Sequence, residues 1–173
     1  GDRVVSTDIL PYCRARDVAF TGSVFKPKSR LYAFFDNVNV SRYITPDVPY
    51  VNYFTTSSGT SNQDSTDITV TNVASFPSSG SISVNGETIT YGGVNASTTP
   101  QKFTGCGSHS AIGDGAIVYK TPAMGDPLIT GATGKHSGTF SIPDPNVSGN
   151  PAFKVGERVL RLTSDPLNGP LNG

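Results

Sequence analysis

Short apolar runs separated by glycine, proline and asparagine corners limit the fold of this chain more than any other feature. In residues 67–72, 81–84 and 87–91, apolar side chains alternate with polar ones, which is the period of a half-buried β-strand. The last two runs flank Asn85 and Gly86, a pair that favours a two-residue hairpin because a type I′ turn needs positive φ at both positions. No window sustains the i, i+3, i+4, i+7 apolar spacing of a helix. The sequence therefore predicts an all-β protein.

Composition and charge agree with strands joined by many turns, and they limit the partners. The 173 residues include 19 Gly and 13 Pro, only 15% are charged, and the net charge is +0. Binding to nucleic acid or to an anionic membrane needs a surplus of Lys and Arg. No run reaches the roughly 20 apolar residues that span a bilayer, and no signal peptide is recognised. We therefore expect neither a nucleic acid nor a membrane as partner.

Two polar, turn-rich stretches divide the chain. Residues 55–65 consist almost wholly of Ser, Thr, Gly, Asn, Gln and Asp, and similar sequence returns at 122–134, as in linkers. The strand patterns before the first stretch and after the second are each too short for a stable pair of sheets. Together they can supply two facing sheets with one core. The middle pattern is then an insertion at a loop tip, where insertions are best tolerated.

These patterns predict a β-sandwich domain, of immunoglobulin-like type, that carries a second and smaller β-barrel or roll domain in its middle. The expected boundaries are an extended N-terminal arm at 1–16, a discontinuous sandwich at 17–62 and 120–165, an inserted domain at 63–119, and a C-terminal tail at 166–173.

Four aromatic residues close to the first polar stretch are the candidate contact residues. They lie near Pro46 and Pro49, just before the expected linker, where aromatic rings can stack on a sugar or on a partner protein. The alternative is that they fill the sandwich core or the seam between the domains. The four residues are Tyr43, Tyr50, Tyr53 and Phe54.

No pattern in the sequence indicates catalysis. His109 lies near Ser108 and Asp114, but the Gly-x-Ser-x-Gly elbow that would present a nucleophile is absent, so we expect a surface-loop histidine. The glycine-rich residues 105–115 lack the Lys-Ser or Lys-Thr of a phosphate loop. A glycosidase needs two paired carboxylates, and nothing in the sequence pairs any two acidic residues such as Asp36, Asp47, Glu87 and Glu157.

Residue spacing also predicts no metal or cofactor site. His109 and His136 are far apart, and with Cys13 and Cys106 they do not match the ligand spacing of zinc sites. Two cysteines in a chain of this length do not form a disulfide framework, and we expect reduced thiols in a protein made in a reducing cytoplasm. Three residues with oxygen ligands lack the spacing and the bidentate Glu of a calcium loop; they are Asn62, Asp64 and Asp67.

Several stretches resemble modules of bacteriophage virion proteins. Residues 11–16 and 25–40, continued by 138–143 and 153–163, resemble a repeat in large tail and baseplate structural proteins of contractile-tailed phages, including those of cyanobacteria. Residues 68–106 are similar to a small β unit that is scattered through phage tail proteins. In that family the Gly-Cys pair is often followed by Arg-Gly, where this chain continues with Gly-Ser-His, so the turn is expected to differ.

The resemblance implies a non-enzymatic structural component of a phage virion, in the tail, baseplate or tail fibre, that acts in assembly and as a spacer. Its partners would be other virion structural proteins, in a homo-oligomeric or otherwise symmetric assembly built in the cytoplasm of the host cell. The resemblance carries over no catalytic residue. The alternative function is a carbohydrate- or receptor-binding adhesion module at a fibre tip, with a host-surface glycan as ligand.

Overall fold

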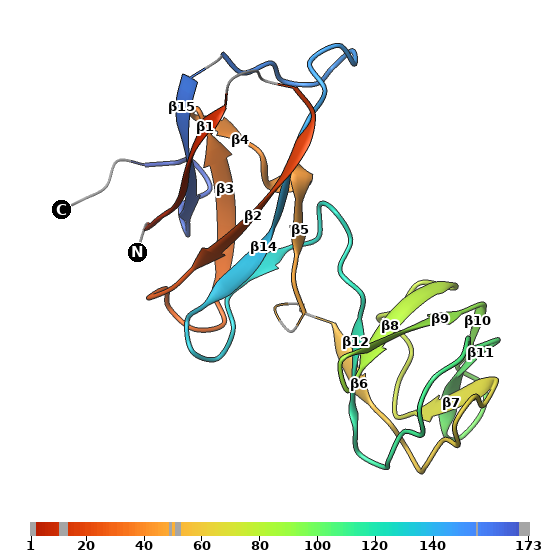
Figure 1. The fold of residues 1–173 in the computed structure, drawn as a ribbon. Helices are drawn as coiled ribbons and strands as arrows, with labels where there is room; N and C mark the ends of the chain where they lie inside the picture. The colour runs from red at the N-terminus through yellow and green to blue at the C-terminus, as the bar shows by residue number, and fades with distance from the viewer. Residues whose placement is uncertain (1–2, 11–13, 49, 51–52, 155, 170–173) are drawn as a thin grey trace. The chain divides into compact units, whose positions relative to one another are not determined.

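The computed structural model describes residues 3–10, 14–48, 50, 53–154 and 156–169, and it is all-β (Figure 1). Strands make up 43% of the chain. Every strand pair within the described residues is antiparallel. The one helical turn in the described part of the chain is a short 3-10 segment, η1 (Ser41–Tyr43). The prediction of an all-β protein with several antiparallel sheets is therefore confirmed.

Contacts between Cα atoms divide the chain into two compact units. The framework unit consists of Gly1–Tyr50 and Pro122–Gly173, and the inserted unit is Val51–Thr121. The inserted unit thus begins earlier than the expected residue 63 and ends close to the expected residue 119. Each unit is described separately below.

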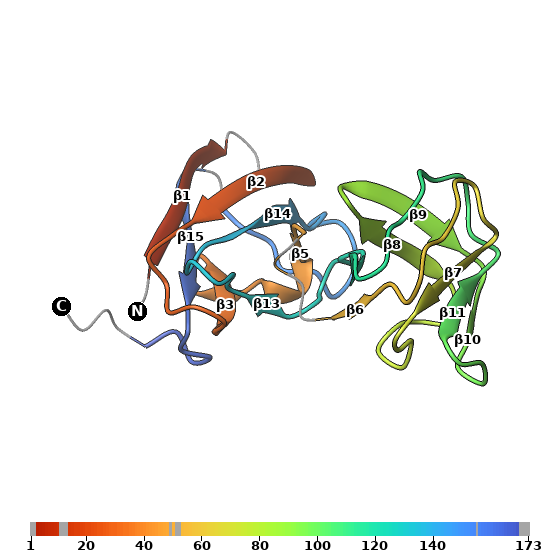
Figure 2. The same cartoon turned by 90° about the horizontal axis from the view of Figure 1, so that it is seen from below.

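Two sheets with sequence-distant strands form the framework unit. One sheet has the order β1-β15-β3-β13, with β4 pairing with β3; the bounds are β1 Arg3–Leu10, β15 Gly156–Thr163, β3 Arg30–Phe35, β13 Leu128–Ile129 and β4 Val38–Asn39. The other sheet has the order β2-β14-β5, with β2 Arg16–Gly22, β14 His136–Ile142 and β5 Ile44–Pro46. In both Figure 1 and Figure 2, β2 and β14 lie side by side.

The core of the framework unit collects the inward side chains of both sheets. Along β14 every second residue is buried, as expected for a strand with one face on a core. Phe140 of this strand packs edge-on against Phe35 of β3 at 5.2 Å between ring centroids, and Phe35 also meets Phe153 at 4.9 Å. Burial of each such side chain contributes about 2–3 kcal/mol. The shared core makes this unit β-sandwich-like.

Residues expected to be an extended N-terminal arm belong to a strand in the structure. Strand β1 pairs with β15 from Arg3, opposite Leu162, to Leu10, opposite Gly156. Local sequence patterns do not reveal this pairing, because the partner strand lies near the other end of the chain. Cys13, in the same stretch, lies outside the described residues.

The inserted unit also contains two sheets. A four-stranded sheet has the order β6-β12-β8-β9, with β6 Phe54–Thr56, β12 Ile117–Lys120, β8 Gly80–Val84 and β9 Glu87–Tyr91. A three-stranded sheet has the order β10-β11-β7, with β10 Gly93–Asn95, β11 Gln101–Thr104 and β7 Asp67–Val70. The β8–β9 hairpin turns at Asn85 and Gly86, whose φ values of 51° and 82° confirm the predicted two-residue turn (Figure 2).

A second, separate core closes the inserted unit. Phe103 is fully buried, and its ring lies 5.0 Å from that of Phe76 and 4.8 Å from that of Tyr91. The chain enters this unit through β6 and leaves it through β12, and these two strands pair with each other. Entry and exit are therefore neighbours, and the unit can fold around its own core.

The polar stretch expected as a linker, 55–65, is structured and belongs to the inserted unit. Hydrogen bonds of the hydroxyl side chains hold this stretch in place, where few apolar side chains are present. The Ser57 hydroxyl donates to the Gly113 carbonyl at 2.6 Å and accepts from the Ala116 amide at 2.8 Å. Ser61 forms a β-bridge with Ile112. Buried hydroxyls that are bonded in this way cost little, which is why a polar sequence is ordered here.

Candidate binding face on the inserted unit

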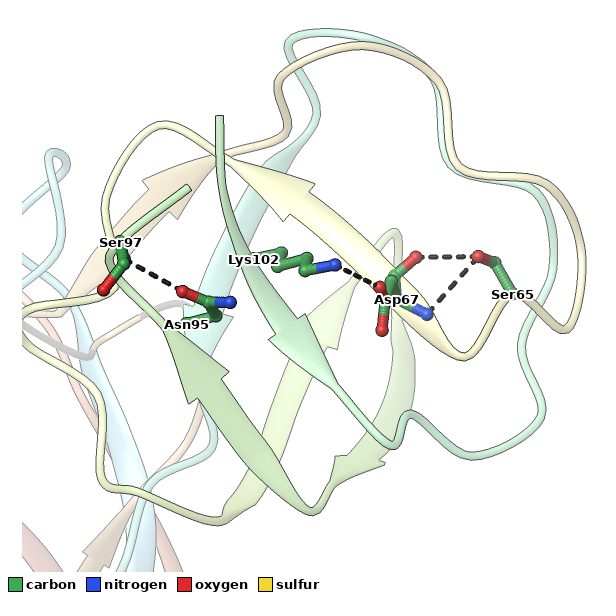
Figure 3. Close-up of polar contacts among 5 residues, drawn as sticks. All are labelled: Ser65, Asp67, Asn95, Ser97 and Lys102. Atoms are coloured by element: carbon green, nitrogen blue, oxygen red, sulfur yellow. Dashed lines mark hydrogen bonds and ion pairs between the residues drawn. The ribbon is translucent and has the colours of Figure 1, made fainter. Parts of the chain in front are cut away.

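The outer face of the three-stranded sheet is an ordinary hydrated surface. Its outward side chains come from positions that alternate with buried Ile68 and Phe103. Lys102 Nζ donates to Asp67 Oδ2 at 2.6 Å across the strands (Figure 3). Ser65 bonds Asp67 beside this pair. A partly exposed ion pair of this kind contributes at most about 1 kcal/mol to the free energy of unfolding. It makes this surface polar.

The outer face of the four-stranded sheet has a different character. Phe54 is 60% exposed and Ile117 is 45% exposed. Tyr119 lies directly opposite Phe54 in the register, with 6.3 Å between the ring centroids. Exposed aromatic and aliphatic groups that are gathered on one surface commonly mark an interaction site.

The remaining outward positions of this sheet carry only hydroxyl side chains. Strands β8 and β9 pair so that Ser83 lies opposite Thr88 and Ser81 lies opposite Thr90, and Tyr119 lies opposite Ser83. None of the outward positions of these four strands, all within the described residues, carries a charge. We call this surface the aromatic face; it comprises Phe54, Thr56, Ser81, Ser83, Thr88, Thr90, Ile117 and Tyr119. Of these, Ser83 is only 8% exposed.

Strand alternation places Tyr53 and Phe54 differently. Tyr53 lies two residues before buried Thr55 and so is on the same side of the strand. The Nζ atom of Lys120 lies 5.4 Å from the centroid of the Tyr53 ring. Phe54 points to the opposite side, beside Tyr119. Two aromatic residues that are adjacent in sequence therefore do not form one contact surface.

The other two candidate aromatics belong to the framework unit. Tyr43 is partly buried against the framework core, and its hydroxyl lies 3.2 Å from Asn150 Oδ1. The ring of Tyr50 packs on that of His136 at 5.5 Å between centroids. Only Phe54 of the four expected residues thus lies on the aromatic face. Sequence reasoning missed Tyr119 and Ile117 because the sequence does not reveal that their strand, β12, pairs with β6.

His109 is buried, and the expectation of a surface-loop histidine is wrong. Its side chain is only 3% exposed. Nδ1 lies 2.6 Å from the Ser110 carbonyl oxygen and Nε2 lies 3.0 Å from that of Ser65. The backbone amide of His109 donates to Asp64 Oδ1 at 3.1 Å. Both ring nitrogens face backbone carbonyls, so this histidine joins two loops.

Replacing this ring is expected to weaken the inserted unit. His109→Ala removes the buried ring together with its hydrogen bonding toward the Ser110 and Ser65 carbonyls, so the free energy of unfolding of this unit should fall by about 2–3 kcal/mol. Thermal or urea unfolding followed by NMR signals of the inserted unit measures the loss. Ser110→Ala is the matched control, because it keeps the carbonyl that contacts the ring; an equal loss in both variants would contradict the account.

His136 is buried in the framework unit between aromatic rings. Its side chain is 1% exposed, Nδ1 lies 3.3 Å from the Ile129 carbonyl oxygen, and the ring of Phe20 is 5.9 Å away. Burial lowers the pKa of His136 below its ordinary value of 6.5, although the Ile129 carbonyl and the charge of Asp47 partly oppose this. The folded protein therefore holds this imidazole neutral.

This burial predicts a loss of stability in acid. The unfolded chain binds the proton at a pKa near 6.5 and the folded chain only at a lower pKa, so stability falls as the pH drops below about 6.5 and stops falling below the lowered pKa. Unfolding free energies of the framework unit, measured across this range, should show the effect. His136→Gln should flatten this part of the profile; an unchanged slope would refute the assignment.

A shallow hollow of about 310 Å³ lies at the end of the framework sheet, around the turn between β3 and β4. Its arginines already hold other parts of the chain. Arg161 donates to Asn168 and, at 2.7 Å, to the Gly169 carbonyl, and Arg158 Nε lies 3.8 Å from Asp36 Oδ2. The hollow thus borders a C-terminal segment that Arg161 fastens to the sheet.

The described residues contain no group of three or more His, Cys, Asp or Glu side chains that could hold a metal ion. Of the oxygen-bearing residues, Asp64 accepts from His109 and Asp67 pairs with Lys102. Cys106 is a half-buried free thiol, and burial together with the charge of Asp67 raises its pKa to about 11. The same part of the chain has no helix long and apolar enough to cross a membrane.

Comparison with protein-family models, curated proteins and solved structures finds no match for this chain.

Proposed function

We propose that the protein is a non-enzymatic structural module of a phage virion, in the tail, baseplate or tail fibre. The framework unit, as an immunoglobulin-like sandwich, acts as a spacer that packs against other virion proteins in a symmetric assembly. The inserted unit, as a small barrel or roll, is displayed on this spacer. The resemblance of residues 25–40 and 68–106 to phage tail modules supports the assignment to a virion.

One observation carries the proposal. The inserted unit has its own core around Phe103, and its first and last strands, β6 and β12, are paired neighbours. A unit connected in this way can be added to a scaffold without disturbing the scaffold's core. This arrangement suits a protein that combines a spacer with a displayed module, and no constellation of side chains in the described residues suits a catalyst.

Mass spectrometry of purified virions and of isolated tails tests this proposal. The chain should be found in tails at a stoichiometry set by the symmetry of the particle. Antibody labelling of intact particles should then locate it along the tail. Absence of the chain from purified virions would overturn the proposal.

The second candidate function is a carbohydrate- or receptor-binding adhesion module. The aromatic face favours it, because Phe54 and Ile117 are exposed although their burial in the unit's own core would have been stabilising. Adhesion and a structural role are compatible in one protein, since the framework unit can pack in the particle while the inserted unit makes the contact.

A further inference from the structure

The aromatic face presents two neighbouring rings that face different directions. Phe54 and Tyr119 are cross-strand neighbours with ring centroids 6.3 Å apart and ring planes inclined by 55°, so each ring can receive a different unit of a ligand. Beneath them, Thr55 and Val118 are buried and paired with each other. Rings that stand on a sheet are held by a rigid backbone, so little conformational entropy is lost when a ligand binds.

The hydroxyl groups around the rings fit a sugar better than a protein. The centres of protein interfaces are depleted in Ser and enriched in large apolar groups. Here the two strands beside the rings present Ser81, Thr88 and Thr90, whereas Ser83 is buried. Hydroxyl side chains donate and accept hydrogen bonds, as the hydroxyls of a sugar do, and an aromatic face attracts the weakly positive C–H groups of a pyranose ring.

Charge decides which sugar fits. All outward positions of this sheet are neutral, whereas the outer face of the neighbouring sheet carries the Asp67–Lys102 pair. A ligand with carboxylate or sulfate groups would find no cation on the aromatic face to replace its lost hydration. A neutral ligand meets no such cost.

We propose that the aromatic face binds a neutral oligosaccharide of hexose or N-acetylhexosamine units, which stacks on Phe54 and Tyr119. The flanking Ser and Thr hydroxyls hydrogen-bond the ligand. This inference rests on the proposed function, because it assumes that the inserted unit is displayed at the surface of the particle.

A glycan array followed by saturation-transfer NMR on the full chain tests the inference. The probes are neutral hexose and N-acetylhexosamine oligosaccharides, with uronic-acid and sulfated oligosaccharides for comparison. A neutral oligosaccharide should bind with an affinity that is insensitive to salt. Phe54→Ala and Tyr119→Ala should each weaken binding by about tenfold or more.

Two further variants serve as controls. Phe54→Tyr keeps the ring and should retain binding. Lys102→Ala changes the outer face of the other sheet and should leave binding unchanged. Because the altered side chains lie at the surface, thermal unfolding should show that every variant remains folded.

Four outcomes would overturn the inference, three of them concerning glycan binding. These three are binding to no neutral oligosaccharide, binding that survives both alanine variants, and binding restricted to acidic oligosaccharides that weakens with salt. Self-association that is lost in Phe54→Ala would assign the face to a second copy of the chain and would also refute it. A chain that is present in purified tails but binds no glycan would leave the proposed structural function standing.

Discussion

Gly134→Ala is expected to destabilise the framework unit by about 3–5 kcal/mol, because its cost combines strain and a steric clash. The φ of Gly134 is +71°, and a Cβ atom at this position would lie 2.1 Å from the carbonyl oxygen of Phe25. The two backbones cannot easily separate, because the Phe25 amide donates to the Gly134 carbonyl at 3.0 Å. Phe25 is itself part of the framework core, so relief of the clash would disturb that core.

Urea unfolding followed by NMR signals of the framework unit measures this effect. Gly149→Ala is the matched control, because φ at Gly149 is +86° but no atom lies within 4 Å of the added Cβ. In the control, only the left-handed backbone conformation is unfavourable, so the free energy of unfolding should fall by about 1–2 kcal/mol. Equal losses in the two variants would show that the approach of Gly134 to Phe25 is not as close as described here.

Phe103→Ala should have the largest effect on the inserted unit, a loss of about 3–5 kcal/mol. Phe103 is fully buried, and its ring contacts those of Phe76 and Tyr91. Its removal leaves a cavity at the centre of a small core that belongs to this unit alone. Since small domains are only marginally stable, we expect a large part of the inserted unit to unfold.

The framework unit should remain folded in Phe103→Ala. Phe140→Ala is the reciprocal variant, because Phe140 is buried in the framework core and should affect only that unit. Two-dimensional NMR spectra distinguish the two results. If either substitution unfolded both units together, the two cores would unfold as one cooperative unit. The division of the chain into two units would then be wrong.

Local turn chemistry was predictable from the sequence. The Asn85-Gly86 turn and the strands on either side of it follow from positive φ and from alternation, which are properties of neighbouring residues. The all-β class follows from the same patterns. By contrast, the pairing of β1 with β15 and of β6 with β12 joins segments that are far apart, and no local property of the sequence specifies such a pair.

The same limit applies to the candidate site. The sequence singled out Phe54, but it could not supply Tyr119, because that neighbour depends on the register between β6 and β12. The composition of the polar stretch 55–65 predicts a linker. It does not reveal that hydroxyl groups such as that of Ser57 donate hydrogen bonds to carbonyls far away in the sequence. The burial of His109 could not be predicted either. The loops that contribute the carbonyl oxygens beside its ring nitrogens come together only in the folded chain.

Excision of the inserted unit tests the central claim most directly. Residues 51–121 are replaced by a flexible Gly-Ser linker, and the two-dimensional NMR spectrum of the shortened chain is compared with that of the full protein. We predict that the signals of framework-core residues such as Phe35, Phe140 and Leu162 keep their positions and that unfolding remains cooperative. A collapsed spectrum without dispersion would contradict the account, because it would mean that the framework cannot close its core without the segment between its two halves.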